Sequence, residues 1–299
     1  MSLTSLLQKQ DVKQRFRQEF PMPTMAVERE IFAPPLSNHY SLVGTAFDYL
    51  MRFYLKRLNP DAVAGQWIAE QALSSPLLGS VVSYDLDVHR WVAIKERAGI
   101  APSRETELAK KARSIIAQAK VNYADYLSLG QITDQLMESA LQLAQLDPIF
   151  RAGVIDENLG NVHKEDVDDL RKLIYLVEPQ LFKASCLCLL DPTFGEASQL
   201  VGGADADLVI DDAIIDIKTT KNLKLERDYF NQLIGYLVLH EITGVGGLVP
   251  KPKITRLGIY FSRYAFLYML DLGPVIHQDK FPVFVDWFIA RAKQAPRLR

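Results

Sequence analysis

Carboxylates and one ammonium are concentrated within a short stretch, residues 202–220. Asp205 and Asp207 come directly before a short apolar run, and Asp216 and Lys218 lie in the next one. Because side chains alternate along a strand, each of these two pairs shares one strand face. Converging carboxylates suit a hard cation such as Mg²⁺ or Mn²⁺, and a lysine beside it can stabilise negative charge or position an attacking water. The segment therefore predicts a divalent-cation site.

The same stretch predicts a β-hairpin with a tight loop. With Asp212-Ala213 as the two-residue loop, Asp207 lies opposite Lys218 and Asp216 lies on the diagonal, roughly 7–8 Å away. A loop one residue longer would turn one strand over and separate the charges. Asp211 and Asp212 themselves are expected to be solvated turn acids. The face opposite the acids is expected to pack on a core, since its residues are branched and apolar: Leu208, Ile210, Ile215 and Ile217.

These residues resemble the PD-(D/E)XK nuclease superfamily and, within it, the RecB-like exonuclease branch. In that family a glycine precedes an aspartate that enters a strand, a second strand carries (D/E)-x-K, and the next helix carries Q-x-x-x-Y. Here Gly203 precedes Asp207, Asp216-Ile217-Lys218 matches the second element, and Gln232–Tyr236 matches the third. Three elements in this order within about 35 residues are a far more specific match than any one of them.

The resemblance implies a role for each matched residue. Asp207 and Asp216 would bind Mg²⁺ or Mn²⁺, with the backbone carbonyl of Ile217 as a further ligand. Lys218 would be the catalytic lysine of phosphodiester hydrolysis. Gln232 and Tyr236 are four residues apart and so lie on one helical face, where the family uses them to support the metal site or to contact substrate. For Tyr236, packing in the core is the alternative interpretation.

Two further metal ligands stay open. Asp205 stands at the literal G-x-x-D spacing, whereas Asp207 stands directly before the strand; we favour Asp207, with Asp205 replacing it or sharing its role. Asp48 occupies the place of an additional ligand that the family often carries on an N-terminal helix, and a solvated helix acid is the alternative. No iron–sulfur cluster is expected, because the chain has only two cysteines, Cys186 and Cys188.

The elements that must position these residues are predicted from periodicity and from breakers. The first 20 residues and residues 41–58 are predicted to be helical, and residues from about 67 to 169 mostly so, with one helix at 132–146 that ends at Asp147-Pro148. Strands are expected at 181–190, 207–211, 214–219, 254–261 and 265–272, and further helices at 105–129, 228–240 and 282–293.

The fold class is therefore α/β. The resemblance implies a restriction-endonuclease-like mixed β-sheet core flanked by helices, with a long helical insertion before the core. We expect a single PD-(D/E)XK nuclease-like domain over residues 1–299. Its parts would be an N-terminal core helix at 41–58, the insertion at about 67–169 and the catalytic α/β core at about 180–299.

Composition limits the partners. The chain of 299 residues has 34 Lys and Arg against 36 Asp and Glu, so its formal net charge is −2. DNA would therefore be held by a local basic patch and not by global charge. No apolar run reaches the length that spans a membrane, and the N-terminus lacks the pattern of a signal peptide, so we expect a cytoplasmic protein without membrane contact.

The function implied by the resemblance is that of a metal-dependent deoxyribonuclease. It would hydrolyse phosphodiester bonds in DNA, as an exonuclease-like hydrolase, in DNA repair, recombination or defence against foreign DNA. Its partners would be DNA and other protein subunits of a repair or defence complex. The alternative is a non-catalytic nucleic-acid-binding or assembly subunit with the same fold. A third interpretation is a structural cation site in an unrelated α/β protein.

Overall fold

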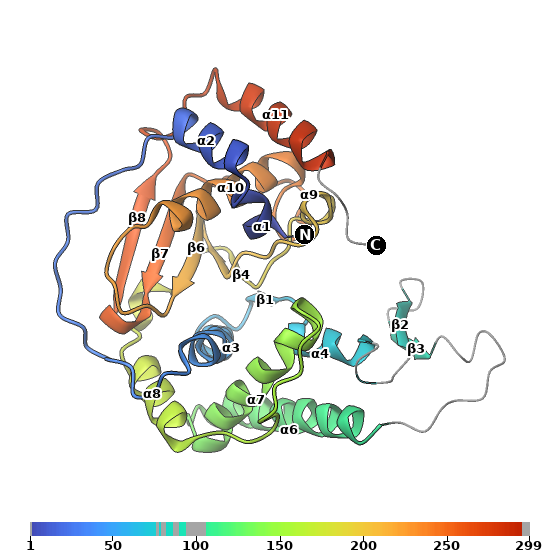
Figure 1. Ribbon diagram of the computed structural model, residues 1–299. Helices are drawn as coiled ribbons and strands as arrows, with labels where there is room; N and C mark the ends of the chain where they lie inside the picture. The colour runs from blue at the N-terminus through green and yellow to red at the C-terminus, as the bar shows by residue number, and fades with distance from the viewer. Residues whose placement is uncertain (1, 76–77, 79–81, 86–89, 94–105, 295–299) are drawn as a thin grey trace. The chain divides into compact units, whose positions relative to one another are not determined.

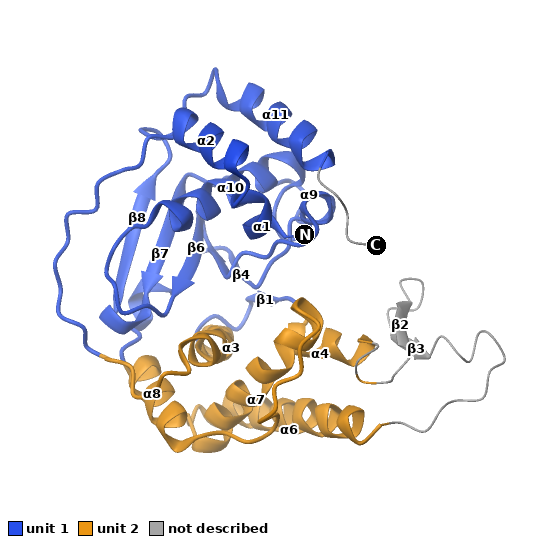
Figure 2. Ribbon diagram, in the orientation of Figure 1, with its two compact units in different colours: residues 1–32, 58–65, 176–299 blue, residues 33–57, 66–175 orange. Residues whose placement is uncertain are grey.

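The computed structural model describes residues 2–75, 78, 82–85, 90–93 and 106–294 (Figure 1). The chain divides into two compact units (Figure 2). Unit 1 comprises residues 1–32, 58–65 and 176–299, and unit 2 comprises residues 33–57 and 66–175. The predicted core helix at 41–58 falls almost entirely in unit 2, and the interpretation of both units as one nuclease-like domain stays a prediction.

Unit 1 contains a mixed six-stranded sheet in the order β1-β4-β5-β6-β7-β8. Its β1/β4 and β6/β7 neighbours are parallel, and its other neighbours are antiparallel. Together with its helices, this open sheet confirms the predicted α/β class. The strands are β1 (Val63–Ala64), β4 (Cys188–Leu190), β5 (Leu208–Ile210), β6 (Ala213–Lys218), β7 (Arg256–Phe261) and β8 (Phe266–Asp271).

The helices of unit 1 pack their apolar residues against the sheet in one buried cluster. They are α1 (Leu3–Leu7), α2 (Gln10–Glu19), α9 (Glu196–Val201), α10 (Arg227–Thr243) and α11 (Phe281–Lys293), with the 3₁₀ turns η3 (Pro179–Leu181) and η4 (Ser262–Tyr264). Because β6 and β7 are parallel, the chain must cross over between them, and α10 lies in this crossover.

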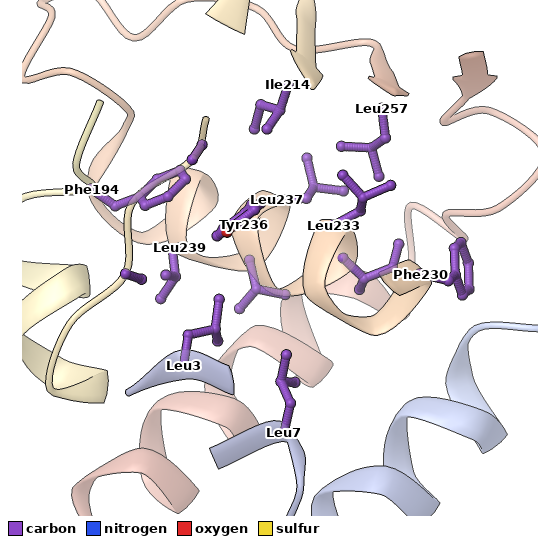
Figure 3. Packing of buried hydrophobic residues seen from close by; sticks show 14 of the residues in the cluster. Leu3, Leu7, Phe194, Ile214, Phe230, Leu233, Tyr236, Leu237, Leu239 and Leu257 are labelled. Atoms are coloured by element: carbon purple, nitrogen blue, oxygen red, sulfur yellow. The ribbon is translucent and has the colours of Figure 1, made fainter. Parts of the chain in front are cut away.

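Helix α10 is the centre of this core. Its sequence is apolar nearly all round, which is typical of a helix buried on several sides. Figure 3 shows α10 between the sheet residues Ile214 and Leu257 and the α1 residues Leu3 and Leu7. Burying one such side chain contributes about 1.5–3 kcal/mol. The helix ends where Gly244 adopts a φ of 84°, a left-handed value that glycine tolerates best.

Unit 2 is mainly helical. It contains α3 (Tyr40–Leu58, except its last residue), α4 (Ile68–Gln71), the 3₁₀ turn η1 (Ala72–Ser74), α6 (Glu107–Leu129), α7 (Asp134–Arg151), α8 (Lys164–Tyr175) and an antiparallel pair, β2 (Val82–Asp85) and β3 (Arg90–Ala93). The buried Tyr49 hydroxyl joins three of these helices, since it donates to Asp147 at 2.6 Å and accepts the Ala69 N–H at 3.0 Å.

Most predicted elements are confirmed to within a few residues: α3, α6, α10, α11, β5, β6, β7 and β8. The N-terminal helix is present as two helices, α1 and α2, and residue 105, the predicted start of α6, lies outside the described residues. In the described part of the chain, no helix is long and apolar enough to cross a membrane.

The bounds of two predicted elements were wrong, and some elements were not predicted. The strand expected over 181–190 is reduced to β4, because the preceding segment forms η3 and a loop. Helix α7 does not end at Asp147-Pro148 but continues to Arg151. Pro148 lacks only its own N–H donor, and the Pro148 carbonyl still accepts the Ala152 N–H at 2.8 Å. The short α9 and the β2/β3 pair were not predicted.

The loop before β4 is held by Asp211. Its carboxylate accepts the backbone N–H groups of residues 185–187 at 2.8–3.1 Å. Burial by itself raises the pKa of Asp211, but these hydrogen bonds outweigh it and lower the pKa to about 2. Asp212 forms an ion pair with Arg256, whose Nε lies 3.0 Å from Oδ1. The expectation that both turn acids are merely solvated was therefore wrong.

We predict that Asp211→Asn lowers the free energy of unfolding by about 1–2 kcal/mol at neutral pH, because charge-assisted hydrogen bonds become neutral ones. Asparagine tolerates the left-handed backbone of this position, which has a φ of 52°. Urea unfolding measures the loss, and exposed Asp286→Asn is the control, expected to stay within about 0.5 kcal/mol of the unmodified chain.

The pH dependence of this loss has a defined sign. The folded pKa of Asp211, about 2, lies below the unfolded value of about 3.9. The stabilisation is therefore complete above about pH 4 and disappears as the pH falls towards 2, so the two proteins should converge in acid. A difference that persists unchanged at low pH would contradict this explanation.

Candidate active site

The hairpin of β5 and β6 has a different register from the expected one. Ile210 lies opposite Ala213, so the loop is Asp211-Asp212 and the expected loop, Asp212-Ala213, was wrong. Tight hairpin turns require a positive φ at the first loop residue, and aspartate adopts it more readily than a branched residue does. Continued by one pair, the observed register places Asp207 opposite Asp216, whereas we expected Lys218 there.

The face that carries the acids is buried. Asp216 is only 2% exposed, and its neighbours on the same face, Val209 and Ile214, belong to the core cluster around α10. The other hairpin face is buried as well, as predicted from Leu208 and Ile215. Both faces of the hairpin are thus covered by other parts of the unit. The acids lie on the side of α10, with Asp216 buried and Asp207 half-buried.

Asp207 connects the two strands through its side chain. Its Oδ2 accepts the backbone N–H of Ile217 at 2.6 Å, one pair beyond the end of the β5 ladder. Its backbone carbonyl accepts the N–H of Asp191 at 2.9 Å. The chain reaches this position through Gly202 and Gly203, which have φ values of 79° and 123° and end α9. These glycines are needed for their backbone conformation.

Lys218 links the strand to the helix. Its Nζ lies 2.7 Å from Asp216 Oδ2 and donates to Gln232 Oε1 at 3.1 Å. Gln232 Nε2 in turn donates to Tyr236 Oη at 2.7 Å. The ring of Tyr229 lies beside the ammonium, with its centroid 5.0 Å from Nζ, at the distance of a cation–π contact. A continuous polar chain therefore runs from Asp216 to Tyr236.

Tyr236 combines a polar and an apolar contact. Its ring stacks on Phe194, with centroids 5.7 Å apart, inside the core that Figure 3 shows. Its hydroxyl receives the hydrogen bond from Gln232. The ring of Tyr236 is therefore part of the core, as the alternative interpretation expected. Its hydroxyl belongs to the polar chain of the candidate site.

The electrostatics reflect two facing carboxylates, of which Asp216 is buried and Asp207 is half-buried. Burial, reinforced by the negative charge of Asp216, raises the pKa of Asp207 to about 7, against the opposing effects of Lys218 and the Ile217 N–H. Burial also raises the pKa of Asp216, and the adjacent Lys218 ammonium opposes this. Burial raises the pKa of Tyr236 well above its usual value, so its hydroxyl stays protonated. The site therefore attracts positive charge.

Asp191 is a member of this region that the sequence analysis missed. It follows β4 directly, and the β4/β5 register, continued by one pair, places it opposite Asp207. Its charge contributes to the raised pKa of Asp207. Asp191 directly follows an apolar run, and Asp207 directly precedes one. This position beside an apolar run is the sequence signal that could have identified Asp191. Asp205 forms an isolated bridge with Thr193, and its charge adds to the raised pKa of Tyr236.

The donor set is compatible with a hard divalent cation. The buried carboxylate of Asp216 and the half-buried carboxylate of Asp207 lie on adjacent strands and repel each other. A cation would relieve this repulsion. Within the described residues, no group of three or more His, Cys, Asp or Glu side chains is arranged to hold a metal ion. A cation would thus be bound by Asp207 and Asp216 with backbone or water oxygens, as Mg²⁺ commonly is. The roles of the Ile217 carbonyl and Asp205 stay predictions.

Asp48 lies elsewhere in the chain. It is a half-buried residue of α3 in unit 2, and its backbone carbonyl accepts a hydrogen bond from Arg52 Nε at 3.1 Å. Its part in a metal site stays a prediction.

Comparisons with known proteins give no assignment. No protein-family model matches the chain, and neither a curated protein nor a solved structure matches it. The function of the chain is therefore inferred from its residues and their geometry.

We predict that Asp207→Asn raises the free energy of unfolding by roughly 1–3 kcal/mol in EDTA at pH 8. The substitution removes the half-buried charge that faces the buried Asp216. The amide oxygen still accepts the Ile217 N–H, and the amide group can donate to Asp216. Thermal or urea unfolding measures the gain. Asp286→Asn, on the exposed side of α11, is the matched control. A destabilised Asp207→Asn protein would contradict the repulsion described above.

Lys218→Met should lower the free energy of unfolding by about 3–5 kcal/mol, because it leaves the buried Asp216 carboxylate without its cation. Adding Asp216→Asn to Lys218→Met should recover part of this loss. A double-mutant cycle from urea unfolding measures the coupling between the two residues. Strict additivity would mean that the two side chains do not interact.

Proposed function

We propose that the chain is a metal-dependent nuclease of the PD-(D/E)XK type, similar to the RecB-like branch, that hydrolyses phosphodiester bonds in DNA. The single observation that carries this proposal is the contact set between the hairpin and α10. Asp207 and Asp216 lie on facing positions, Lys218 contacts Asp216, and Gln232 links Lys218 to Tyr236. The resemblance implied these same five residues.

The architecture supports the proposal at a second level. Three antiparallel strands, β4 to β6, are followed by α10 and by β7, which is parallel to β6. The acids thus lie on the hairpin, and the Gln/Tyr helix is the crossover that covers it. This arrangement is compatible with a restriction-endonuclease-like mixed sheet flanked by helices.

Each residue of the chain would have a distinct task in hydrolysis. Asp207 and Asp216 would hold Mg²⁺ or Mn²⁺, which when bound neutralises charge on the phosphate and polarises a water molecule. The Lys218 ammonium, fixed by Asp216, Gln232 and the Tyr229 ring, would stabilise the additional negative charge that develops on the phosphate oxygens. Gln232 and Tyr236 would keep the ammonium in that place, since a fixed donor needs no reorganisation during the reaction.

The partners and setting belong to the same proposal. The site would act on DNA, as an exonuclease-like enzyme in repair, recombination or defence, with other protein subunits of such a complex as further partners. The formal net charge of −2 requires that any DNA be held locally. Cytoplasmic location is part of the proposal.

One observation favours the alternative, a non-catalytic nucleic-acid-binding or assembly subunit. In the described residues, the metal-binding side chains near Lys218 form no group of three, and the ammonium of Lys218 already compensates Asp216. Metal binding separates the two functions: a nuclease must bind Mn²⁺ through Asp207 and Asp216, and a non-catalytic subunit need not.

We predict that the purified chain cleaves DNA with Mg²⁺ or Mn²⁺ and not in EDTA. Linear and circular, single- and double-stranded substrates would be compared, since cleavage of circles distinguishes an endonuclease from an exonuclease. Asp216→Asn should remove cleavage, because it removes a ligand without changing the shape of the side chain, and Asp286→Asn should leave cleavage unchanged.

Calorimetric titration with Mn²⁺ accompanies this assay. Cleavage that is retained by Asp216→Asn would refute the site. Absent cleavage together with Mn²⁺ binding that Asp216→Asn abolishes would indicate a site that needs a partner subunit. Absence of both would favour the non-catalytic alternative.

A further inference from the structure

A second group of reactive side chains lies in unit 2, where α3 and α8 begin. A cavity of about 280 Å³ opens there, and nearly all of its lining side chains are polar. They include His39, Gln145, Asp156, Asn158 and His163. None of these residues has a part in the proposed nuclease chemistry.

The orientation of His39 is fixed by a buried carboxylate. Asp166 is completely buried, and its Oδ2 lies 2.9 Å from His39 Nδ1. The other oxygen, Oδ1, accepts the Ser37 hydroxyl at 2.6 Å. Since a carboxylate only accepts hydrogen bonds, Nδ1 of His39 must donate. In the neutral ring the lone pair is then on Nε2, the nitrogen away from Asp166.

The second imidazole lies at a separation from the first that is compatible with a shared ion. The rings of His39 and His163 have centroids 5.0 Å apart and planes inclined by 44°. Two imidazoles that bind one tetrahedral ion at about 2.0–2.1 Å also have centroids roughly 5 Å apart. The backbone of His163 is fixed at the start of α8, because its carbonyl accepts the N–H groups of Asp166 and Val167 in the first turn of that helix.

We propose that His39 and His163 bind one transition-metal dication, such as Zn²⁺, Co²⁺ or Ni²⁺, at the mouth of this cavity. Asp166 is the positioning residue, since a carboxylate on the second nitrogen commonly orients a metal-binding histidine. No third His, Cys, Asp or Glu side chain within the described residues completes the site. The remaining coordination positions therefore belong to water or to a small ligand in the cavity.

The chemistry of the two histidines distinguishes this site from the candidate active site. Imidazole nitrogen suits Zn²⁺, Co²⁺ and Ni²⁺, whereas the carboxylates Asp207 and Asp216 suit Mg²⁺ and Mn²⁺. The His39/His163 site does not rest on the proposed nuclease function, and either one can be wrong without the other. The competing explanation is that the Asp166–His39 pair only ties the start of α3 to α8.

The test is metal binding by the full chain after removal of any affinity tag. The Asp207→Asn/Asp216→Asn background removes the carboxylate site, so that the remaining binding reports on the histidines. Zn²⁺ is titrated by calorimetry, and Co²⁺ by the visible absorption that nitrogen ligation gives it. One ion per chain is expected.

Three variants assign the ligands. His39→Ala and His163→Ala should each weaken Zn²⁺ binding by about tenfold or more, and Asp166→Asn by about 10–100-fold. The matched control is His277→Ala, since His277 is also exposed but belongs to unit 1, and it should bind as the background does. His163→Ala keeps the test valid if the buried Asp166→Asn variant fails to fold, because His163 is exposed.

Absence of Zn²⁺ binding in the background protein would overturn the site. Binding that neither histidine variant weakens, or that His277→Ala weakens equally, would overturn it as well. In those cases the Asp166–His39 pair is a structural tie between α3 and α8.

Discussion

The ion pair between Asp216 and Lys218 is the interaction on which the candidate site depends. A carboxylate that is 2% exposed is costly unless a cation compensates it, and the Lys218 ammonium at 2.7 Å does so. The same ammonium donates to Gln232, so the compensation of one charge also fixes the helix face that carries Tyr236. Strand and helix are thus joined by polar contacts inside an apolar core, where partners are obligatory.

In the described part of the chain, the side-chain contacts of Asp207 are of a different kind. It accepts one backbone N–H and faces Asp216, and its pKa is raised to about 7. The fold therefore carries an unfavourable, half-buried carboxylate beside its core, although an apolar residue would pack there at lower cost. Local destabilisation of this kind is typical of functional sites, where the missing partner is supplied by a ligand. This is the physical reason to interpret the pair Asp207 and Asp216 as a ligand-binding site and not as two carboxylates without a function.

The face shared by the acids could be predicted from the sequence, although the register could not. The expected register pairs residue 211 with 214, whereas the observed register pairs residue 210 with 213. The partner of each residue is therefore shifted by two positions along the other strand. Since side chains alternate with period two, a shift of two keeps every residue on its face and changes only which residues are opposite. Asp207 therefore still lies on the face of Asp216 and Lys218, with Asp216 as its direct neighbour. The position of the loop depends on Asp211 and its bonds to residues 185–187, a contact over about 25 positions that no local pattern reveals.

Tertiary contacts also explain two features that local sequence patterns did not predict. The burial of the acid face follows from α10 packing over it, which is tertiary information, and Asp191 becomes relevant only through the pairing of β4 with β5. In unit 2, Asp166 resembles Asp216 in one respect: a buried carboxylate accepts a hydrogen bond from a side chain that reaches outwards, here His39. The difference lies in the group that the carboxylate holds. Lysine has only donors, so Lys218 can offer an anion a positive charge, whereas an imidazole held through Nδ1 presents a lone pair at Nε2 and can bind a cation. The two buried carboxylates thus fix different groups, an ammonium in unit 1 and an imidazole in unit 2.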